Sequence, residues 1–277
     1  MTRYDGGMES IALKSVREKI RRAQTHLDAI NAALKLTLSS EPESECVTID
    51  VEGEGQHAIS KFRKINPIDP SLPLMIGDCI HNLRSALDHL AFQLALLNGS
   101  SSSAAEKTIF PICLVKSGPN GFDKRVDRAL RPFITSTALA EIEKCQPYKA
   151  YSVPNQADIW ILHKLDIIDK HRLLLIARDQ FAATQFWFTV EGKSGHVVIP
   201  DPKWKPMEDG AEIIRFRTIG GLPRKVEMNM KIEATRTVQL INTGLICDGM
   251  PVATVLTQVG GIVKAIVRDF GRSFFGE

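Results

Sequence analysis

A helix-length stretch, residues 71–99, constrains the fold more than any other part of the chain. Apolar residues recur in it every three or four positions, the spacing that keeps one face of an α-helix against its neighbours: Ile76, Ile80, Leu83, Leu87, Leu90, Leu94 and Leu97. Asp69-Pro70-Ser71 precedes the stretch and Asn98-Gly99 ends it, as is typical of a helix start and a helix end. The sequence therefore predicts a long helix inside a bundle.

A second row of residues follows the same helix and is polar. It runs through Asp78, His81 or Asn82, Ser85, and Asp88 or His89. A solvated helix face is usually rich in Lys and Glu, whereas this row holds His, Asp, Asn and Ser. The choice of residues favours a row that lines a groove, and we expect Arg84, Ser85, Asp88 and His89 to line it together.

The segment Arg84-Ser85-Ala86-Leu87-Asp88-His89 resembles the motif of the HEPN superfamily of helical-bundle nucleases, in which an Arg, a polar residue and a His share one helix. The resemblance implies metal-independent cleavage of RNA by attack of the ribose 2′-OH, with two copies of the motif facing each other across a homodimer. It implies no cofactor and no metal ligands. It leaves open whether this chain cleaves RNA or only binds it.

The chemistry assigns roles to the residues of the row. Arg84 would hold a phosphate and His89 would act as general acid and base, with Ser85 and Asp88 completing the catalytic set. His81 and Asn82 would bind substrate or orient the imidazole. A carboxylate from Asp78 or Asp88 beside an imidazole should raise the pKa of that histidine.

Residues 8–38 form a first long helix, according to the same three-four spacing of apolar residues. Its flank carries basic residues against Glu9 and Glu18: Lys14, Arg17, Lys19, Arg21 and Arg22. Such a flank is either a solvated face or an edge that attracts phosphate groups. The sequence favours the solvated face and keeps both alternatives open.

A third helix is expected from about Gln156 to Arg172. Asp166 and Lys170 have the i,i+4 spacing of an ion pair, and the cluster Asp169-Lys170-His171-Arg172 follows at its end. The cluster either caps the helix or adds Lys170, His171 and Arg172 to a substrate-binding surface. Together with the Phe-Pro-Ile and Gln-Pro-Tyr segments, residues 76–175 also resemble an uncharacterised bacterial family with an Asp-Lys-His-Arg segment, a resemblance that implies architecture and no particular chemistry.

The remaining periodicity completes the expected fold. A hairpin is predicted within 45–65, alternating strands within 181–242, and a closing helix at 251–272. The prediction is an α+β protein in which a bundle of about four long helices, from 8–38, 71–99, 118–177 and 251–272, packs with a mostly antiparallel β-sheet. The 277 residues are taken as one domain.

Composition excludes few functions. A net charge of +3 permits a polyanionic partner without requiring one. Five cysteines without a Cys-x-x-Cys pair argue against a disulfide framework, and no run of residues has the length and hydropathy of a membrane span, so a cytoplasmic protein is expected.

Two other functions fit the same row. One is a non-catalytic interaction or structural protein in which the polar row is a satisfied buried network. The other is a metal-dependent hydrolase whose ligands come from facing helices, drawn from Asp78, His81, His89, His163, Asp166 and His171.

Overall fold

The computed structural model describes residues 11–39, 47–52, 57–62, 69–171, 176–190, 193–198, 205–206, 210, 212–217 and 231–277. The chain divides into two compact units. Unit 1 comprises Met1–Ile30, Pro73–Ile176 and Asn242–Glu277, and unit 2 comprises Asn31–Leu72 and Ala177–Ile241. The single domain over 1–277 stays a prediction.

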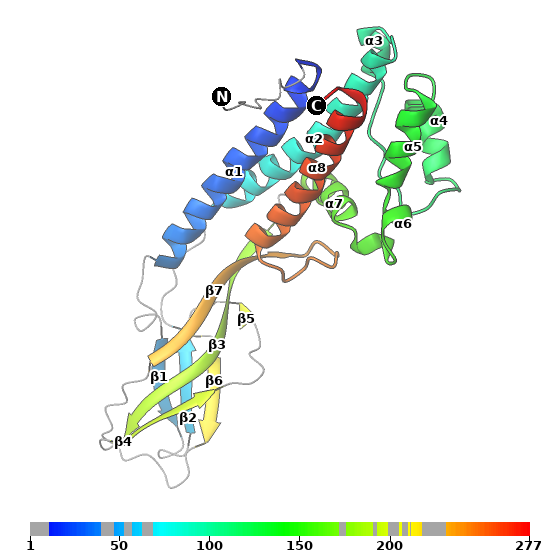
Figure 1. Ribbon diagram of the computed structural model, residues 1–277. Coiled ribbons are helices and arrows are strands. Elements are labelled where there is room, and N and C mark those ends of the chain that lie inside the picture. The colour runs from blue at the N-terminus through cyan, green and yellow to red at the C-terminus, as the bar shows by residue number, and fades with distance from the viewer. Residues whose placement is uncertain are drawn as a thin grey trace, which may run out of the picture. The chain divides into compact units, whose positions relative to one another are not determined.

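The long helices α1 and α2 carry most of their residues in unit 1, which also holds the shorter helices (Figure 1). In chain order the helical elements are η1 (Ile11–Leu13), α1 (Lys14–Ser39), α2 (Leu72–Leu97), α3 (Ser102–Ala105), α4 (Phe122–Ala129), α5 (Ser136–Lys144), α6 (Pro147–Ala150), η2 (Pro154–Gln156), α7 (Asp158–His171) and α8 (Val252–Phe274).

Helices α1, α2 and α8 lie side by side in unit 1 (Figure 1). The Cys79 thiol on α2 donates to the carbonyl of Ala23 on α1 at 3.3 Å, and Lys264 Nζ on α8 donates to Gln24 Oε1 at 2.8 Å. The core between the helices is apolar, with fully or almost fully buried residues that include Leu13, Val16, Ala23, Ile76, Ile80, Leu83, Leu87, Leu90, Val255, Val259, Ile266 and Phe270. Burial of this seam is what holds the polar row of α2 in a fixed orientation.

Both ends of α2 follow from the residues that the sequence places there. Asp69 Oδ1 accepts a hydrogen bond from the backbone N–H of Ser71 at 2.8 Å, which lowers the pKa of Asp69. At the other end Gly99 adopts a φ of +83°, and Ser100 N–H bonds to the Ala95 carbonyl at 3.0 Å. The buried seam stops one turn earlier than expected, because Leu97 is 55% exposed.

The strands form small antiparallel groups in unit 2. β1 (Val47–Glu52) pairs with β2 (His57–Phe62), with Val47 opposite Phe62, and β2 pairs with β6 (Glu212–Arg217). β3 (Ile176–Val190), which begins at the last residue of unit 1, pairs with β4 (Lys193–Val198), β5 (Lys205–Pro206) and β7 (Lys231–Ile241). The pairing of β1 with β2 is the hairpin expected within 45–65.

The predicted fold class is wrong. The structure is mostly helical (67%), which conflicts with a bundle packed against a mostly antiparallel β-sheet. The described interior of unit 1 is filled by contacts between helices and loops, and the paired strands belong to unit 2. Alternating apolar residues indicate a strand with one buried face, but they do not identify what covers that face.

Helix boundaries agree with the sequence more closely. The helical region predicted over 118–177 contains α4, α5 and α7, of which α7 is the helix expected from about Gln156, and it also contains α6, which was not predicted; the closing helix is α8, which starts at Val252. Residues 8–10, Arg172 and parts of 181–242 lie outside the described residues.

Candidate functional site

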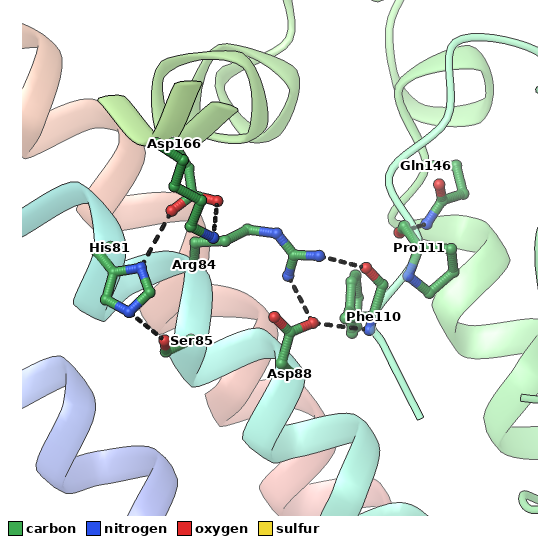
Figure 2. Close-up of polar contacts among 9 residues, drawn as sticks. His81, Arg84, Ser85, Asp88, Phe110, Pro111, Gln146 and Asp166 are labelled. Atoms are coloured by element: carbon green, nitrogen blue, oxygen red, sulfur yellow. Dashed lines mark hydrogen bonds and ion pairs between the residues drawn. The ribbon is translucent and has the colours of Figure 1, made fainter. Parts of the chain in front are cut away.

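Arg84 is a buried residue that holds a loop in place. The guanidinium donates from Nη1 to Asp88 Oδ1 at 2.9 Å and from Nη2 to the Phe110 carbonyl at 2.8 Å. The same Asp88 oxygen accepts the Phe110 backbone N–H at 3.0 Å. The Arg84 side chain is 7% exposed. The carbonyl and the N–H of Phe110 are thus hydrogen-bonded to the two members of an ion pair, Arg84 and Asp88, that lie one turn apart on α2 (Figure 2).

A glutamine holds the same loop from the other side. Gln146, which is fully buried, donates from Nε2 to the Pro111 carbonyl at 2.9 Å and accepts the Cys113 backbone N–H at 3.0 Å. Figure 2 shows Gln146 beside Pro111. Residues 110–113 have no regular secondary structure, and these side chains supply the hydrogen bonds that a neighbouring strand would otherwise give.

Burial raises the pKa of Asp88, while the charge of Arg84 opposes that rise. Arg84 and Asp88 therefore use their polar atoms in hydrogen bonds to each other and to the backbone of Phe110. Neither residue lines the groove between α1 and α2 that is described below. The expectation that Arg84, Ser85, Asp88 and His89 share one groove is wrong for this reason. Residues five apart on a helix are rotated by about 140° from each other, so Arg84 and His89 face different surroundings.

His81 and Ser85 lie on α2 and point away from the Arg84 guanidinium (Figure 2). His81 Nδ1 is 3.3 Å from Asp166 Oδ1 on α7, and Ser85 Oγ is 3.4 Å from His81 Nε2. Asp166 is buried, and Lys170 Nζ donates to its other oxygen at 2.7 Å. The i,i+4 ion pair expected within α7 is confirmed, and it joins a network that reaches α2.

A close approach of α7 to α2 accompanies this network. A Cβ on Gly77 would lie 2.5 Å from Asp169 Oδ1, so the absence of a side chain lets Asp169 approach the backbone of α2. Burial and the charges of Asp166 and Asp78 raise the pKa of Asp169. The carboxylates of this cluster are therefore not equivalent, because Lys170 pairs with Asp166 while burial and the neighbouring carboxylates raise the pKa of Asp169.

A groove of about 860 Å³ runs between α1 and α2. It is lined by Ala12, Lys14, Ser15, Glu18, Lys19, Arg22, Asn82, His89 and Gln93. Three of these residues are cations and one, Glu18, is an anion whose carboxylate pairs with Arg21. Asn82 and His89 were predicted to face a substrate, and the structure places both in this groove. The groove is thus basic, with amide and imidazole groups along the α2 side.

His89 differs from the expectation in its ionisation. Burial and the positive charge of Lys19 lower its pKa, and the nearby Asp88 carboxylate only partly offsets them. His89 is therefore a neutral imidazole near pH 7. A net rise of the pKa of His89 by a neighbouring Asp is not found, because burial and the charge of Lys19 outweigh the effect of the Asp88 carboxylate.

The cluster at the end of α7 is only partly described. Lys170 pairs with Asp166, His171 is exposed, and Arg172 lies outside the described residues. None of the groove-lining residues comes from α7. A substrate-binding role for Lys170, His171 and Arg172 therefore stays a prediction. The ion pair with Asp166 gives Lys170 a structural role.

The metal alternative receives no support from the placement of its ligands. Within the described ranges, no group of three or more His, Cys, Asp or Glu side chains is arranged to hold a metal ion. Burial lowers the pKa of His163 to about 4, and its ring packs against Trp160 with centroids 5.5 Å apart. His163 and His81 thus lie in different surroundings.

No described helix has the length and apolar character to cross a membrane.

Sequence reasoning missed several groups that the structure brings in. Gln93 and Ser15 line the groove, and Gln146 holds residues 110–113. Gln93 lies four residues after His89 on the same face of α2, a spacing that was visible in the sequence. Gln146 gave no such signal because the backbone atoms of Pro111 and Cys113 that it bonds are 35 and 33 positions away in the sequence.

Comparisons with known proteins give no further guide to this site. No family model matches the chain, and no curated protein or solved structure is significantly similar to it.

Proposed function

We propose that the protein binds single-stranded RNA in the groove between α1 and α2. The observation that carries the proposal is the set of cations along one side of that groove: Lys14, Lys19 and Arg22. These three cations make no ion pair with an acidic residue in the described part of the chain. Their charge is available to phosphate groups, which dominate the affinity of proteins for nucleic acids.

The opposite side of the groove offers hydrogen-bonding groups without charge. Asn82, His89 and Gln93 lie there, and the lowered pKa of His89 keeps its imidazole neutral near pH 7. Neutral amides and imidazoles can donate to and accept from base edges and ribose hydroxyls, while cations hold the backbone. The arrangement supports a strand that lies along the groove with phosphates toward α1 and sugars and bases toward α2.

The surroundings of Arg84 favour a structural role for one part of the motif. A buried guanidinium with partners at 2.8 and 2.9 Å is not available to a phosphate without breaking the bonds to Phe110 and Asp88. This observation supports the buried-network alternative for Arg84 and Asp88. It is compatible with RNA binding at the groove, because the two groups of residues do not overlap.

The test is the affinity of the full chain for a fluorescent single-stranded RNA of about ten nucleotides, a length in the range of known single-strand sites. Lys19→Glu together with Arg22→Glu should weaken binding by about tenfold or more. The matched control is Lys124→Glu together with Lys149→Glu, which changes the net charge equally at exposed positions outside the groove. The control should bind almost as well as the wild type.

The proposal fails if the wild-type chain does not bind the RNA or if the control pair weakens binding as much as the groove pair. The same oligonucleotide made as DNA provides a further comparison. Weaker binding of DNA is expected if Asn82, His89 or Gln93 contacts the ribose 2′-OH.

Cleavage is the narrower part of the HEPN-like proposal. Among the cations that line the groove, Lys19 is the one whose charge contributes to lowering the pKa of His89. We infer that any metal-independent cleavage uses His89 with Lys19 or Arg22 rather than with Arg84. His89→Ala should then abolish cleavage while weakening RNA binding much less than Lys19→Glu with Arg22→Glu does, and EDTA should have no effect. Cleavage that persists in His89→Ala would overturn this assignment.

The homodimer and the cytoplasmic location belong to the same proposal. A dimer would be tested by sedimentation of the full chain with and without RNA, since the HEPN resemblance implies two motifs facing each other. A monomer under both conditions would remove that part of the proposal and leave RNA binding to be judged by its own experiment.

A further inference from the structure

Three side chains outside the groove form a connected chain of hydrogen-bonding groups. Ser85 Oγ is 3.4 Å from His81 Nε2, and His81 Nδ1 is 3.3 Å from Asp166 Oδ1. With the imidazole proton on Nδ1, that nitrogen donates to Asp166 and Nε2 accepts from the Ser85 hydroxyl. The order is hydroxyl, imidazole, carboxylate, in which the base touches the nucleophile and is itself oriented by an acid.

We propose that Ser85, His81 and Asp166 form a nucleophilic serine site that reacts with small acyl esters. Ser85 is the nucleophile, His81 is the general base and Asp166 is a positioning residue. The site uses neither the groove between α1 and α2 nor the Arg84–Asp88 pair.

The carboxylate is held so that it can orient the imidazole. Asp166 is 4% exposed, and Lys170 Nζ fixes its second oxygen at 2.7 Å. Because Asp166 lies on α7 while His81 and Ser85 lie on α2, the chain of contacts depends on the packing of two helices. A carboxylate fixed in this way selects one tautomer of the imidazole.

The other end of the chain is open to a reactant. The His81 side chain is 49% exposed, and Ser85 is half-buried. Arg84 and Asp88, one residue before and three after Ser85, are by contrast engaged with Phe110. The Ser85 end of the chain is therefore open to a small electrophile, whereas the buried Arg84 on the same helix is not.

The reaction follows from these contacts. Ser85 Oγ attacks the ester carbonyl carbon as its proton passes to His81 Nε2, and the imidazolium then gives that proton to the leaving alcohol as the C–O bond breaks. Water, deprotonated by His81, releases the acid from acyl-Ser85. Backbone N–H groups in the middle of α2 are used in helical hydrogen bonds, so they form no oxyanion hole and we expect slow turnover.

Covalent labelling is the appropriate test because it needs only an activated serine. The full chain is treated with a fluorophosphonate probe, whose phosphorus bonds to Oγ as fluoride leaves, and the adduct is mapped by mass spectrometry of peptides. The expected result is one adduct at Ser85, absent in Ser85→Ala. His81→Gln should slow labelling by about a hundredfold or more. p-Nitrophenyl acetate should give a burst of nitrophenolate stoichiometric with the protein.

Controls separate a catalytic arrangement from a structural one. Ser136→Ala and His171→Gln change an exposed serine and an exposed histidine elsewhere and should label like the wild type. Asp166→Asn should slow labelling, because the imidazole loses the carboxylate that orients it. Circular dichroism verifies that each variant is folded, and the exposed His81 provides a variant that leaves the core intact.

Failure of this inference is distinct from failure of RNA binding. No adduct on the wild type, an adduct at another residue, or a rate unchanged in folded His81→Gln would each overturn the serine site. None of these results alters the affinity for RNA, which depends on Lys19 and Arg22.

Discussion

At the scale of single residues, Arg84 illustrates how a motif can have one meaning in sequence and another in structure. Its position between a serine and a nearby histidine suggested a phosphate ligand, yet its donors point to Asp88 and to the Phe110 carbonyl. A long side chain can reach inward to a backbone acceptor that no sequence pattern identifies. Arg84 therefore contributes to stability, and its charge is neutralised where it lies.

The first prediction concerns this pair. Arg84→Met keeps an apolar side chain but leaves the Phe110 carbonyl without its donor and Asp88 without its cation, so the unfolding free energy should fall by about 2–3 kcal/mol. Arg131→Met breaks an exposed pair with Asp127 at the same i,i+4 spacing and should change stability by less than about 0.5 kcal/mol. Urea denaturation measures both. Equal effects of the two substitutions would contradict the structural role of Arg84.

The second prediction concerns pH. The pKa of His163 is about 4 in the folded chain, below its ordinary value of 6.5, because burial disfavours the imidazolium. Between these values the unfolded chain binds the proton preferentially, so stability from this group is present above pH 6.5 and is lost toward pH 4. The difference in unfolding free energy between wild type and His163→Gln should shrink by about 2 kcal/mol from pH 7 to pH 4.5. A constant difference would contradict the assignment.

Which site residues could be predicted depended on whether their partners were local. Asp166 and Lys170 are four apart on one helix, and their ion pair was evident from the sequence. Asn82 and His89 line the groove between α1 and α2, and their contact with a substrate stays a prediction. The contact of His81 with Asp166 joins residues 85 positions apart, and it depends on the packing of α7 against α2, which periodicity does not specify.

At the scale of elements, the long helices were the most predictable part of the chain. α2 and α8 have uninterrupted three-four patterns and become helices of 26 and 23 residues. The strands were found by alternation, but alternation cannot tell a sheet that covers the bundle from strands that pair in a separate unit. That ambiguity accounts for the wrong fold class.

The third prediction concerns Gly261, one of the three glycines of α8. A Cβ on Gly261 meets no atom within 4 Å, so Gly261→Ala should raise the unfolding free energy by about 0.5–1 kcal/mol through helix propensity. The comparison is Gly99→Ala at the end of α2, where a φ of +83° is strained for alanine and stability should fall by about 1 kcal/mol. Thermal melts report both signs. A loss of stability in Gly261→Ala would mean that this glycine is needed for packing.

At the scale of the whole molecule, a net charge of +3 does not indicate a nucleic-acid partner by itself. The distribution of charge is more informative, because Lys14, Lys19 and Arg22 line one groove, and Glu18, the one acidic residue of its lining, pairs with Arg21. The sequence had left this flank open between a solvated face and an edge for phosphates. The position of the groove favours the second alternative.

The dependence of RNA affinity on salt tests this account most directly. Three groove cations that each neutralise a phosphate should give a slope of about −2 in a plot of log affinity against log salt for a single strand. The account predicts that Lys19→Glu with Arg22→Glu reduces the slope to less than half, while Lys124→Glu with Lys149→Glu leaves it near the wild-type value. A slope that is the same for the wild type and both variant pairs would contradict an RNA-binding groove between α1 and α2.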